Sequence, residues 1–194
     1  MTALRAALVI QNCPAGEFES NLKTCLHMVE KACEQDADII VFPEMNLTGY
    51  ASGNAIRSIA RPIDPELIDQ FEHVCQTRNI TLLTGLAEKY DDNTVYASHL
   101  VFSADGFQGI YRKIHAAPFE QGFIHSGNDI CIFKSKGLIF GIQLCYDAHF
   151  PELSLAMAEK GADIIFMPHA SPRGRADEKL ISWKRHLTAR AFDN

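Results

Sequence analysis

One pattern occurs twice in this chain, and it restricts the folds that the chain can adopt. Residues 37–43 (ADIIVFP) are matched by residues 162–168 (ADIIFMP), and residues 10–13 (IQNC) are matched by residues 142–145 (IQLC). Each copy runs from a strand-like segment through a helix-like segment to a second strand-like segment, so a strand-helix-strand unit occurs twice in the same order. We expect an α/β fold with two related halves, although two matches this short can also arise by chance.

Strand-like and helix-like segments alternate along the chain, which is typical of the α/β class. The Asp105-Gly106 step between two of the strands predicts a hairpin. A loop rich in Gly, Ser and Asn is expected over residues 45–60. We expect strands at 4–12, 38–43, 80–87, 94–103, 107–112, 129–134, 138–144 and 163–167, and helices at 18–35, 65–78, 151–160 and 176–192.

The two halves differ in length. Three strands follow the helix at 65–78 in the first half, whereas the second half ends with the helix at 176–192. Missing strands leave sheet edges open to water, which is unfavourable. We therefore expect one domain over residues 1–194 that lacks its C-terminal strands.

The composition is that of a soluble globular protein, and it argues against several classes of function. A formal net charge of −6 disfavours nucleic acid as a main partner, because the phosphate backbone requires a basic surface. No apolar run approaches the roughly 20 residues of a membrane span, and the chain starts without an apolar signal region. We expect a cytoplasmic protein that binds no membrane. The six cysteines are dispersed, and neither Cys-x-x-Cys nor His-Glu-x-x-His occurs, so nothing predicts a metal site.

Cys145 has the most informative context of the six cysteines. It follows the apolar run 138–144 and precedes a polar stretch, and a helical segment begins a few residues later at Pro151. This order presents a thiol at the end of a rigid strand, facing a cleft. The alternative is a small buried hydrophobic residue, which is the usual state of an isolated cysteine.

Glu44 and Lys113 also follow strand-like runs. A carboxylate can take the proton of a thiol, and an ammonium group favours both the thiolate and the oxyanion that forms after attack on a carbonyl. A covalent acyl intermediate then divides amide cleavage into two easier steps. Alone, Glu44 is equally compatible with a solvated carboxylate at a strand end, and Lys113 alone is most often a surface lysine.

These three positions resemble the nitrilase, or carbon-nitrogen hydrolase, superfamily, in its amidase branch. The glutamate motif resembles residues 42–44 (FPE) followed by 47–50 (LTGY), and the lysine motif resembles 111–115 (YRKIH). The cysteine motif resembles 141–147 (GIQLCYD) with 150–152 (FPE), and the order Glu, Lys, Cys is that of the family. The resemblance covers nearly the whole chain and implies a four-layer α-β-β-α sandwich with pseudo-twofold halves. Family members commonly form homodimers or larger homo-oligomers.

The resemblance implies a role for each site residue. Cys145 is the nucleophile, Glu44 is the general base, and Lys113 stabilises the tetrahedral intermediate together with the backbone N–H of Tyr146. Glu120, which is followed by Phe123 and Gly127 at the family's spacing, orients Lys113 and the substrate. The segment 116–118 (AAP) departs from the leucine that many members carry, which affects the pocket wall.

The activity expected from this resemblance is hydrolysis of small linear amides or N-carbamoyl compounds through a cysteine thioester, with neither metal nor organic cofactor. Nitrile hydrolysis by the same residues is the alternative within the class. A non-catalytic fragment or assembly subunit is an alternative outside it. So is a Cys-His hydrolase that pairs Cys145 with His115, His149 or His169.

The substrate itself is not predicted by the sequence. Arg173, Arg175 and Lys179 follow the second copy of the repeat and are candidates for binding a substrate carboxylate. A solvated loop and helix face is the other interpretation of this cluster. Residues 45–60 and 115–128 are expected to shape the pocket.

Overall fold

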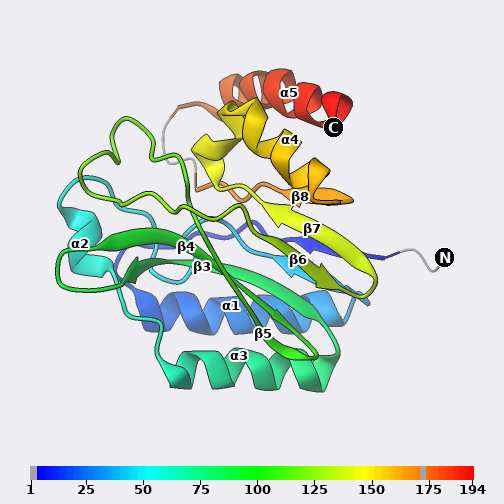
Figure 1. The fold of residues 1–194 in the computed structure, drawn as a ribbon. Helices are drawn as coiled ribbons and strands as arrows, with labels where there is room; N and C mark the ends of the chain where they lie inside the picture. The colour runs from blue at the N-terminus through cyan, green and yellow to red at the C-terminus, as the bar shows by residue number, and fades with distance from the viewer. Residues whose placement is uncertain (1–3, 171–173) are drawn as a thin grey trace.

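A computed structural model describes residues 4–170 and 174–194 (Figure 1). Its helices are α1 (Phe18–Cys33), α2 (Ala55–Ile59), α3 (Pro65–Arg78), α4 (Pro151–Glu159) and α5 (Ala176–Asp193), with a 3-10 helix, η1, at Cys145–His149. Its strands are β1 (Ala6–Leu8), β2 (Ile39–Val41), β3 (Thr81–Lys89), β4 (Val95–Ser103), β5 (Gly106–Arg112), β6 (Ile132–Ser135), β7 (Leu138–Ile142) and β8 (Ile164–Phe166).

The strands form two sheets. The larger sheet has the order β1-β2-β3-β4-β5, in which β1, β2 and β3 are parallel and β3, β4 and β5 are antiparallel. The smaller sheet has the order β6-β7-β8, with an antiparallel first pair and a parallel second pair. The hairpin predicted at Asp105-Gly106 joins β4 to β5, and Gly106 has a φ of 104°, which a residue with a Cβ rarely adopts.

Two cores hold four layers together. One core lies between α1, α3 and the outer face of the larger sheet, where Val29 and Phe71 pack with Phe102. The second core joins the facing surfaces of the two sheets, where Val101 and Phe140 take part, and it reaches α4 through Met157. Figure 1 shows α1 and α3 below the sheets and α4 and α5 above them. This is the expected α-β-β-α arrangement.

The internal repeat is present as two parallel strand pairs, β1 with β2 and β7 with β8. The registers differ, however, because Ile39 pairs with Ala6 whereas its counterpart Ile164 pairs with Phe140. The sequence repeat aligns residues 10–13 with 142–145 and therefore Leu8 with Phe140, whereas the strand pairing aligns Ala6 with Phe140. The two alignments differ by two residues. A two-residue shift keeps each side chain on the same face of its strand.

The sequence missed the helix α2 inside the loop predicted at 45–60. Ile56 of α2 is fully buried and packs in the core between the sheets. A helix this short holds too few apolar positions for a period of about 3.6 residues to stand out. β1 is shorter than expected, since its predicted range of 4–12 includes Ile10, which is 92% exposed. Among the described residues, no helix has the length and apolar character needed to cross a membrane.

Candidate active site

Glu44 lies in the loop directly after β2. Met45 has a φ of 55°, a turn conformation that is unfavourable for a residue with a Cβ, so neighbouring contacts must hold it. Asn46 supplies them, because its side-chain Oδ1 accepts hydrogen bonds from the Gly85 N–H (2.7 Å) and the Thr84 hydroxyl (3.0 Å) on β3. The loop thereby buries the Glu44 carboxylate, whose residue is 2% exposed.

Lys113 lies just past the end of β5 and is also buried. Its Nζ donates to Glu44 Oε1 at 2.8 Å and to Glu120 Oε1 and Oε2 at 3.1 and 2.9 Å. Gly127 closes the loop that carries Glu120, because its N–H donates to the Lys113 carbonyl at 2.8 Å. A Cβ on Gly127 would lie 2.3 Å from the Arg112 carbonyl oxygen, so only glycine allows this approach.

Glu120 is fixed by two further donors. The Ala117 N–H donates to its Oε2 at 2.7 Å, and the Tyr50 hydroxyl donates to its Oε1 at 2.7 Å. Tyr50 ends the LTGY segment, and its ring packs edge-on against Phe119 at 6.5 Å. The carboxylate therefore holds Lys113 in place while being held from two sides itself.

Burial and charge shift the pKa values at this site. Burial raises the pKa of Glu44 above its ordinary value, although Lys113 partly opposes the shift. Burial disfavours the charged form of Lys113, but Glu44, Glu120 and Cys145 together outweigh it and raise its pKa. The pKa of Tyr50 is also raised, first by burial and then by its hydrogen bond to Glu120.

Cys145 opens η1, three residues after β7 ends at Ile142. Its φ is 48°, and its N–H donates to the Pro168 carbonyl at 2.9 Å, which anchors the turn to the segment after β8. The residue is partly exposed, and a thiolate at this position would raise the pKa values of both Lys113 and Tyr50. From the same segment, the Ala170 N–H donates to Glu44 Oε2 at 3.2 Å. The structure thus brings Glu44, Lys113 and Glu120 into direct contact, and Cys145 lies within electrostatic reach of Lys113.

Tyr146 directly follows Cys145 in η1 and is partly exposed. Its ring packs against His149, with centroids 5.2 Å apart, and against Phe150 at 5.6 Å. These contacts hold the residue whose backbone N–H the sequence nominated as an oxyanion donor.

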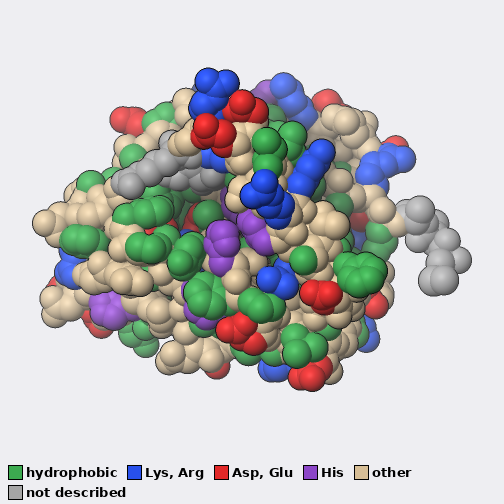
Figure 2. All heavy atoms as spheres, turned by 90° about the horizontal axis from the view of Figure 1, so that it is seen from above, with side chains coloured by type: hydrophobic (Ala, Val, Ile, Leu, Met, Phe, Trp, Pro, Cys, Tyr) green, Lys and Arg blue, Asp and Glu red, His purple; other side chains and the backbone are tan. Residues whose placement is uncertain are grey.

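The three histidines considered as alternative partners for Cys145 make other contacts. His115 Nδ1 lies 3.0 Å from Asp147 Oδ1, and His169 Nδ1 lies 2.6 Å from the Met167 carbonyl. His149 faces His186 of α5, with ring centroids 4.5 Å apart. Figure 2, a view onto the side of the molecule that carries α4 and α5, shows histidine side chains near the middle of that face.

The basic residues proposed for substrate binding are not brought to this cluster by any contact described for them. Arg175 pairs with Asp177 at 3.1 Å, and both side chains are largely exposed. Arg173 lies outside the described residues. Lys179 is partly exposed on α5. Arg175 therefore makes a solvent-exposed ion pair at the start of α5.

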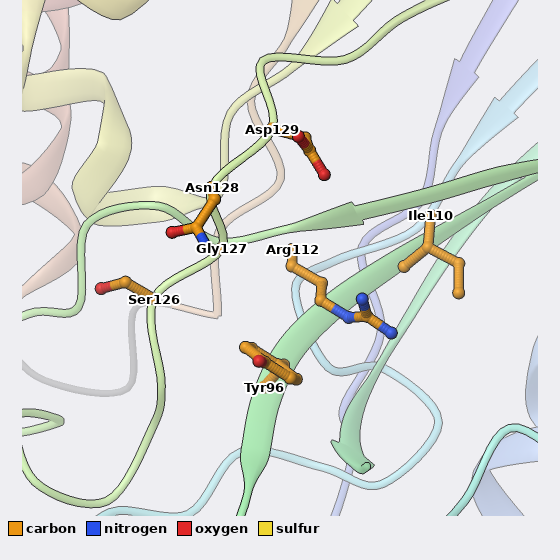
Figure 3. A pocket seen from close by; sticks show the side chains of 7 residues that line it. All are labelled: Tyr96, Ile110, Arg112, Ser126, Gly127, Asn128 and Asp129. Atoms are coloured by element: carbon orange, nitrogen blue, oxygen red, sulfur yellow. The ribbon is translucent and has the colours of Figure 1, made fainter.

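A separate pocket of about 100 Å³ lies beside Arg112, the neighbour of Lys113 (Figure 3). It is lined by Tyr96, Ile110, Arg112, Ser126, Gly127, Asn128 and Asp129. The Arg112 guanidinium binds the buried Glu88 carboxylate through two hydrogen bonds of 2.8 and 2.6 Å. Arg112 is therefore paired away from the Lys113 ammonium. No group of three or more His, Cys, Asp or Glu side chains in the described part of the chain is arranged to hold a metal ion.

The carbon-nitrogen hydrolase family model matches residues 5–194, which is nearly the whole chain. The chain belongs to the carbon-nitrogen hydrolase family. It is 27% identical to an (R)-stereoselective amidase from a Pseudomonas species over 92% of this chain and 63% of that protein. It is 31% identical to a nitrilase from Pyrococcus abyssi, over 85% of this chain and 64% of that protein.

Solved structures support the fold. The structure of the NitN amidase from Nesterenkonia sp. AN1 matches with a TM-score of 0.81 at 22% identity, over 97% of this chain and 74% of that one. A mutant of that amidase carries acrylamide added to its active-site cysteine. The carbon-nitrogen hydrolase chain described here spans about two thirds of the length of its curated relatives, 63–66% for the first four.

The sequence nominated Glu44, Lys113, Glu120, Cys145 and Tyr146, but it missed two residues that make hydrogen bonds in or beside this cluster. Tyr50 belongs to a motif that was quoted, yet its contact with Glu120 spans 70 residues of chain. Asp147 lies two residues after Cys145, and its hydrogen bond with Tyr111 spans 36 residues. Their motif positions were the only available signal.

Proposed function

We propose that this chain carries the active site of a cysteine-dependent hydrolase of small linear amides or N-carbamoyl compounds. The observation that carries the proposal is the buried Lys113 ammonium, held by the Glu44 and Glu120 carboxylates beside Cys145. Burying three charged groups is unfavourable unless they are paired, and such clusters are concentrated at functional sites. Membership of the carbon-nitrogen hydrolase family supports the same reaction class.

In the proposed acylation step, Glu44 takes the proton from the Cys145 thiol, and the thiolate attacks the carbonyl carbon of the amide. The raised pKa of Glu44 suits this role, because a base works best when its pKa lies near the working pH. Lys113 and the Tyr146 N–H stabilise the oxyanion of the tetrahedral intermediate. Its collapse breaks the carbon-nitrogen bond, and the nitrogen leaves as ammonia or an amine with the proton held by Glu44.

In the proposed deacylation step, Glu44 takes a proton from water, and the resulting hydroxide attacks the thioester carbonyl. The carbon-sulfur bond breaks, the acid is released, and Cys145 recovers a proton from Glu44. Glu120 does not exchange a proton in this scheme. It holds Lys113, and its two donors Tyr50 and Ala117 keep it fixed through the cycle.

Nitrile hydrolysis is the second candidate within the class, and the 31% identity to a protein named a nitrilase favours keeping it. The non-catalytic alternative also stands, since the chain spans about two thirds of its relatives. Self-association as a homodimer or larger homo-oligomer and a cytoplasmic location stay predictions from the sequence.

The test is ammonia release from a panel of aliphatic amides, ω-amides, N-carbamoyl amino acids and nitriles. Cys145→Ala is the inactive variant, and Cys131→Ala is its control, because Cys131 is another partly exposed cysteine. We expect ammonia from amides or carbamoyl compounds that Cys145→Ala stops and Cys131→Ala preserves. If the folded chain releases no ammonia from any substrate, the non-catalytic hypothesis is favoured. An active Cys145→Ala variant would remove Cys145 as the nucleophile.

A further inference from the structure

Asp147 is a fully buried carboxylate for which the proposed reaction has no use. It lies in η1, two residues after Cys145, and its side chain is 0% exposed. Its Oδ1 accepts from the His115 backbone N–H at 2.8 Å and lies 3.0 Å from His115 Nδ1. Its Oδ2 accepts from the Tyr111 hydroxyl at 2.8 Å and from the Leu144 N–H at 3.0 Å. Four polar contacts therefore converge on one carboxylate.

The partners come from both sides of the site. Tyr111 and His115 each lie two residues from Lys113, and the Tyr111 side chain is fully buried in the core between the sheets. Leu144 directly precedes Cys145 in the segment after β7. The Asp147 carboxylate thus joins the residues around Lys113, at the end of β5 in the larger sheet, to the turn at Cys145 that follows β7 in the smaller sheet.

Further contacts make this junction rigid. The His115 ring stacks on the Phe150 ring, with centroids 3.6 Å apart and an interplanar angle of 6°. This contact holds the segment after Lys113 against the residue that follows η1. The Asp147 N–H donates back to the Leu144 carbonyl at 3.0 Å, so both the backbone and the side chain of Asp147 hold Leu144. Cys145 lies between these two residues with a φ of 48°, a conformation that persists only when its surroundings enforce it.

We propose that Asp147 is a positioning residue that sets the separation of the Cys145 thiol from the Lys113 ammonium. This inference rests on the proposed function, because it matters only if these two groups react together. The stabilisation of a thiolate by an ammonium group depends on their distance and falls further when water enters between them. A displacement of about 1 Å in a catalytic group can lower a rate by about 100-fold.

A carboxylate is suited to this position because it only accepts hydrogen bonds. The Tyr111 hydroxyl and the two backbone N–H groups are donors here. Because a carboxylate only accepts, we assign His115 Nδ1, 3.0 Å from Oδ1, as the fourth donor. In Asp147→Asn, an amide NH₂ would replace one oxygen and face donors on that side. The substitution keeps the size of the side chain while breaking part of the junction.

The test compares the rates at which acrylamide alkylates each cysteine in the wild type, Asp147→Asn and Tyr111→Phe. Peptide mass spectrometry follows every thiol in the same sample. Cys25 and Cys75 are fully buried and report global opening, since burial raises the pKa of both thiols to about 12. We expect Cys145 to react about 100-fold more slowly in Asp147→Asn and about 10-fold more slowly in Tyr111→Phe, with Cys25 and Cys75 still protected.

Glu88→Gln is the matched control. Glu88 is another buried carboxylate with several donors, namely Arg112 and the Ser98 hydroxyl, but it has no contact with Asp147 among those the structure describes. We expect Glu88→Gln to lower the thermal midpoint without slowing alkylation of Cys145. An equal slowing in Glu88→Gln would show a general structural effect and overturn the positioning role.

The remaining outcomes are also decisive. A wild-type rate at Cys145 in Asp147→Asn would overturn the inference alone. If Asp147→Asn exposes Cys25 and Cys75, then Tyr111→Phe decides the matter, because it keeps the ring and removes one hydrogen bond. If the wild type shows no preference for Cys145, the proposed function fails and this inference fails with it.

Discussion

Glu44 Oε1 and Lys113 Nζ lie 2.8 Å apart inside the protein, although 69 residues separate them in the chain. Both side chains are about 1% exposed. Removing one partner from a buried ion pair typically costs about 3–5 kcal/mol, because the other charge stays buried without compensation. Here Glu120 provides Lys113 with a second carboxylate, so Glu44 can change its protonation state while the lysine remains paired.

Glu44→Gln tests the role of the carboxylate as the base. Glutamine can still accept a hydrogen bond from Lys113 but cannot take the thiol proton, so we expect the acylation burst to disappear. Stopped-flow or quench measurements of the first turnover check this. Glu120→Gln is the control, and it should slow the burst without abolishing it. An unchanged burst in Glu44→Gln would remove Glu44 as the base.

The pH dependence of Cys145 alkylation follows from the same residue. Burial raises the pKa of Glu44, so the deprotonated base is lost on acidification above the ordinary glutamate value of about 4.3. We expect the alkylation rate to fall at a midpoint above that value, and Glu44→Gln to lack this step. A wild-type midpoint at or below the ordinary value would contradict the expectation.

Tyr50→Phe removes one donor from Glu120 and keeps the aromatic contact with Phe119. A hydrogen bond to a charged group contributes about 1.5–3 kcal/mol, so we expect kcat/KM to fall by about 10- to 100-fold. Tyr90→Phe, in an exposed tyrosine, should leave the rate unchanged. Steady-state kinetics on the best amide substrate measures both variants. Equal rates for Tyr50→Phe and the wild type would mean that Glu120 does not need this support.

Gly127→Ala tests the close approach that shapes the Glu120 loop. The new Cβ would lie 2.3 Å from a backbone oxygen, which cannot move away as a flexible side chain could. We expect a loss of about 1–3 kcal/mol in the free energy of unfolding and a larger loss of activity, because the loop carrying Glu120 must shift. Urea unfolding and kinetics measure the two effects, with Ser126→Ala as the neighbouring control. Wild-type stability in Gly127→Ala would contradict the packing at this point.

The buried side chain of His99 should make the free energy of unfolding fall at acidic pH. It is fully buried on β4, and burial lowers its pKa to about 3 in the folded protein, against about 6.5 in the unfolded chain. The unfolded chain therefore binds the proton more tightly, so the contribution of His99 is complete above about pH 6.5 and is lost as the pH falls toward 3. We expect a loss of about 1.4 kcal/mol per pH unit in that window.

Urea unfolding between about pH 7 and pH 5 measures this slope, and His99→Leu should flatten it. His73→Gln, in an exposed histidine of α3, is the control and should keep the wild-type slope. Equal slopes in the wild type and His99→Leu would show that another group controls the acid transition.

The sequence predicted the longer elements because their local signals are strong. Asp64 and Pro65 mark the start of α3, where the Asp64 carboxylate accepts from the Leu67 N–H at 2.8 Å and proline occupies the first turn. Pro151 likewise occupies the first turn of α4, although the residue before it, Phe150, makes no side-chain cap. The charged and thiol residues of the site were found through motifs that end strands.

The contacts that assemble the site could not be read from the sequence. Sheet order, the Tyr50–Glu120 hydrogen bond and the Asp147 junction all join segments far apart in the chain, and local patterns carry no information on such pairs. The two-residue register difference between the halves was hidden for a related reason. The repeated residues indicate similar strand ends in the two halves, but they do not determine how β7 pairs with β8, and that pairing sets the register.

The central claim is that Cys145 is a nucleophile activated by Lys113 and Glu44, and competitive alkylation tests it most directly. The folded wild type is treated with limiting acrylamide, and peptide mass spectrometry measures the modification of all six cysteines. We predict that Cys145 reacts first, that the partly buried Cys13, Cys33 and Cys131 react much more slowly, and that Cys25 and Cys75 stay protected, because burial raises the pKa of these five thiols. Uniform modification, or none at Cys145, would contradict the account.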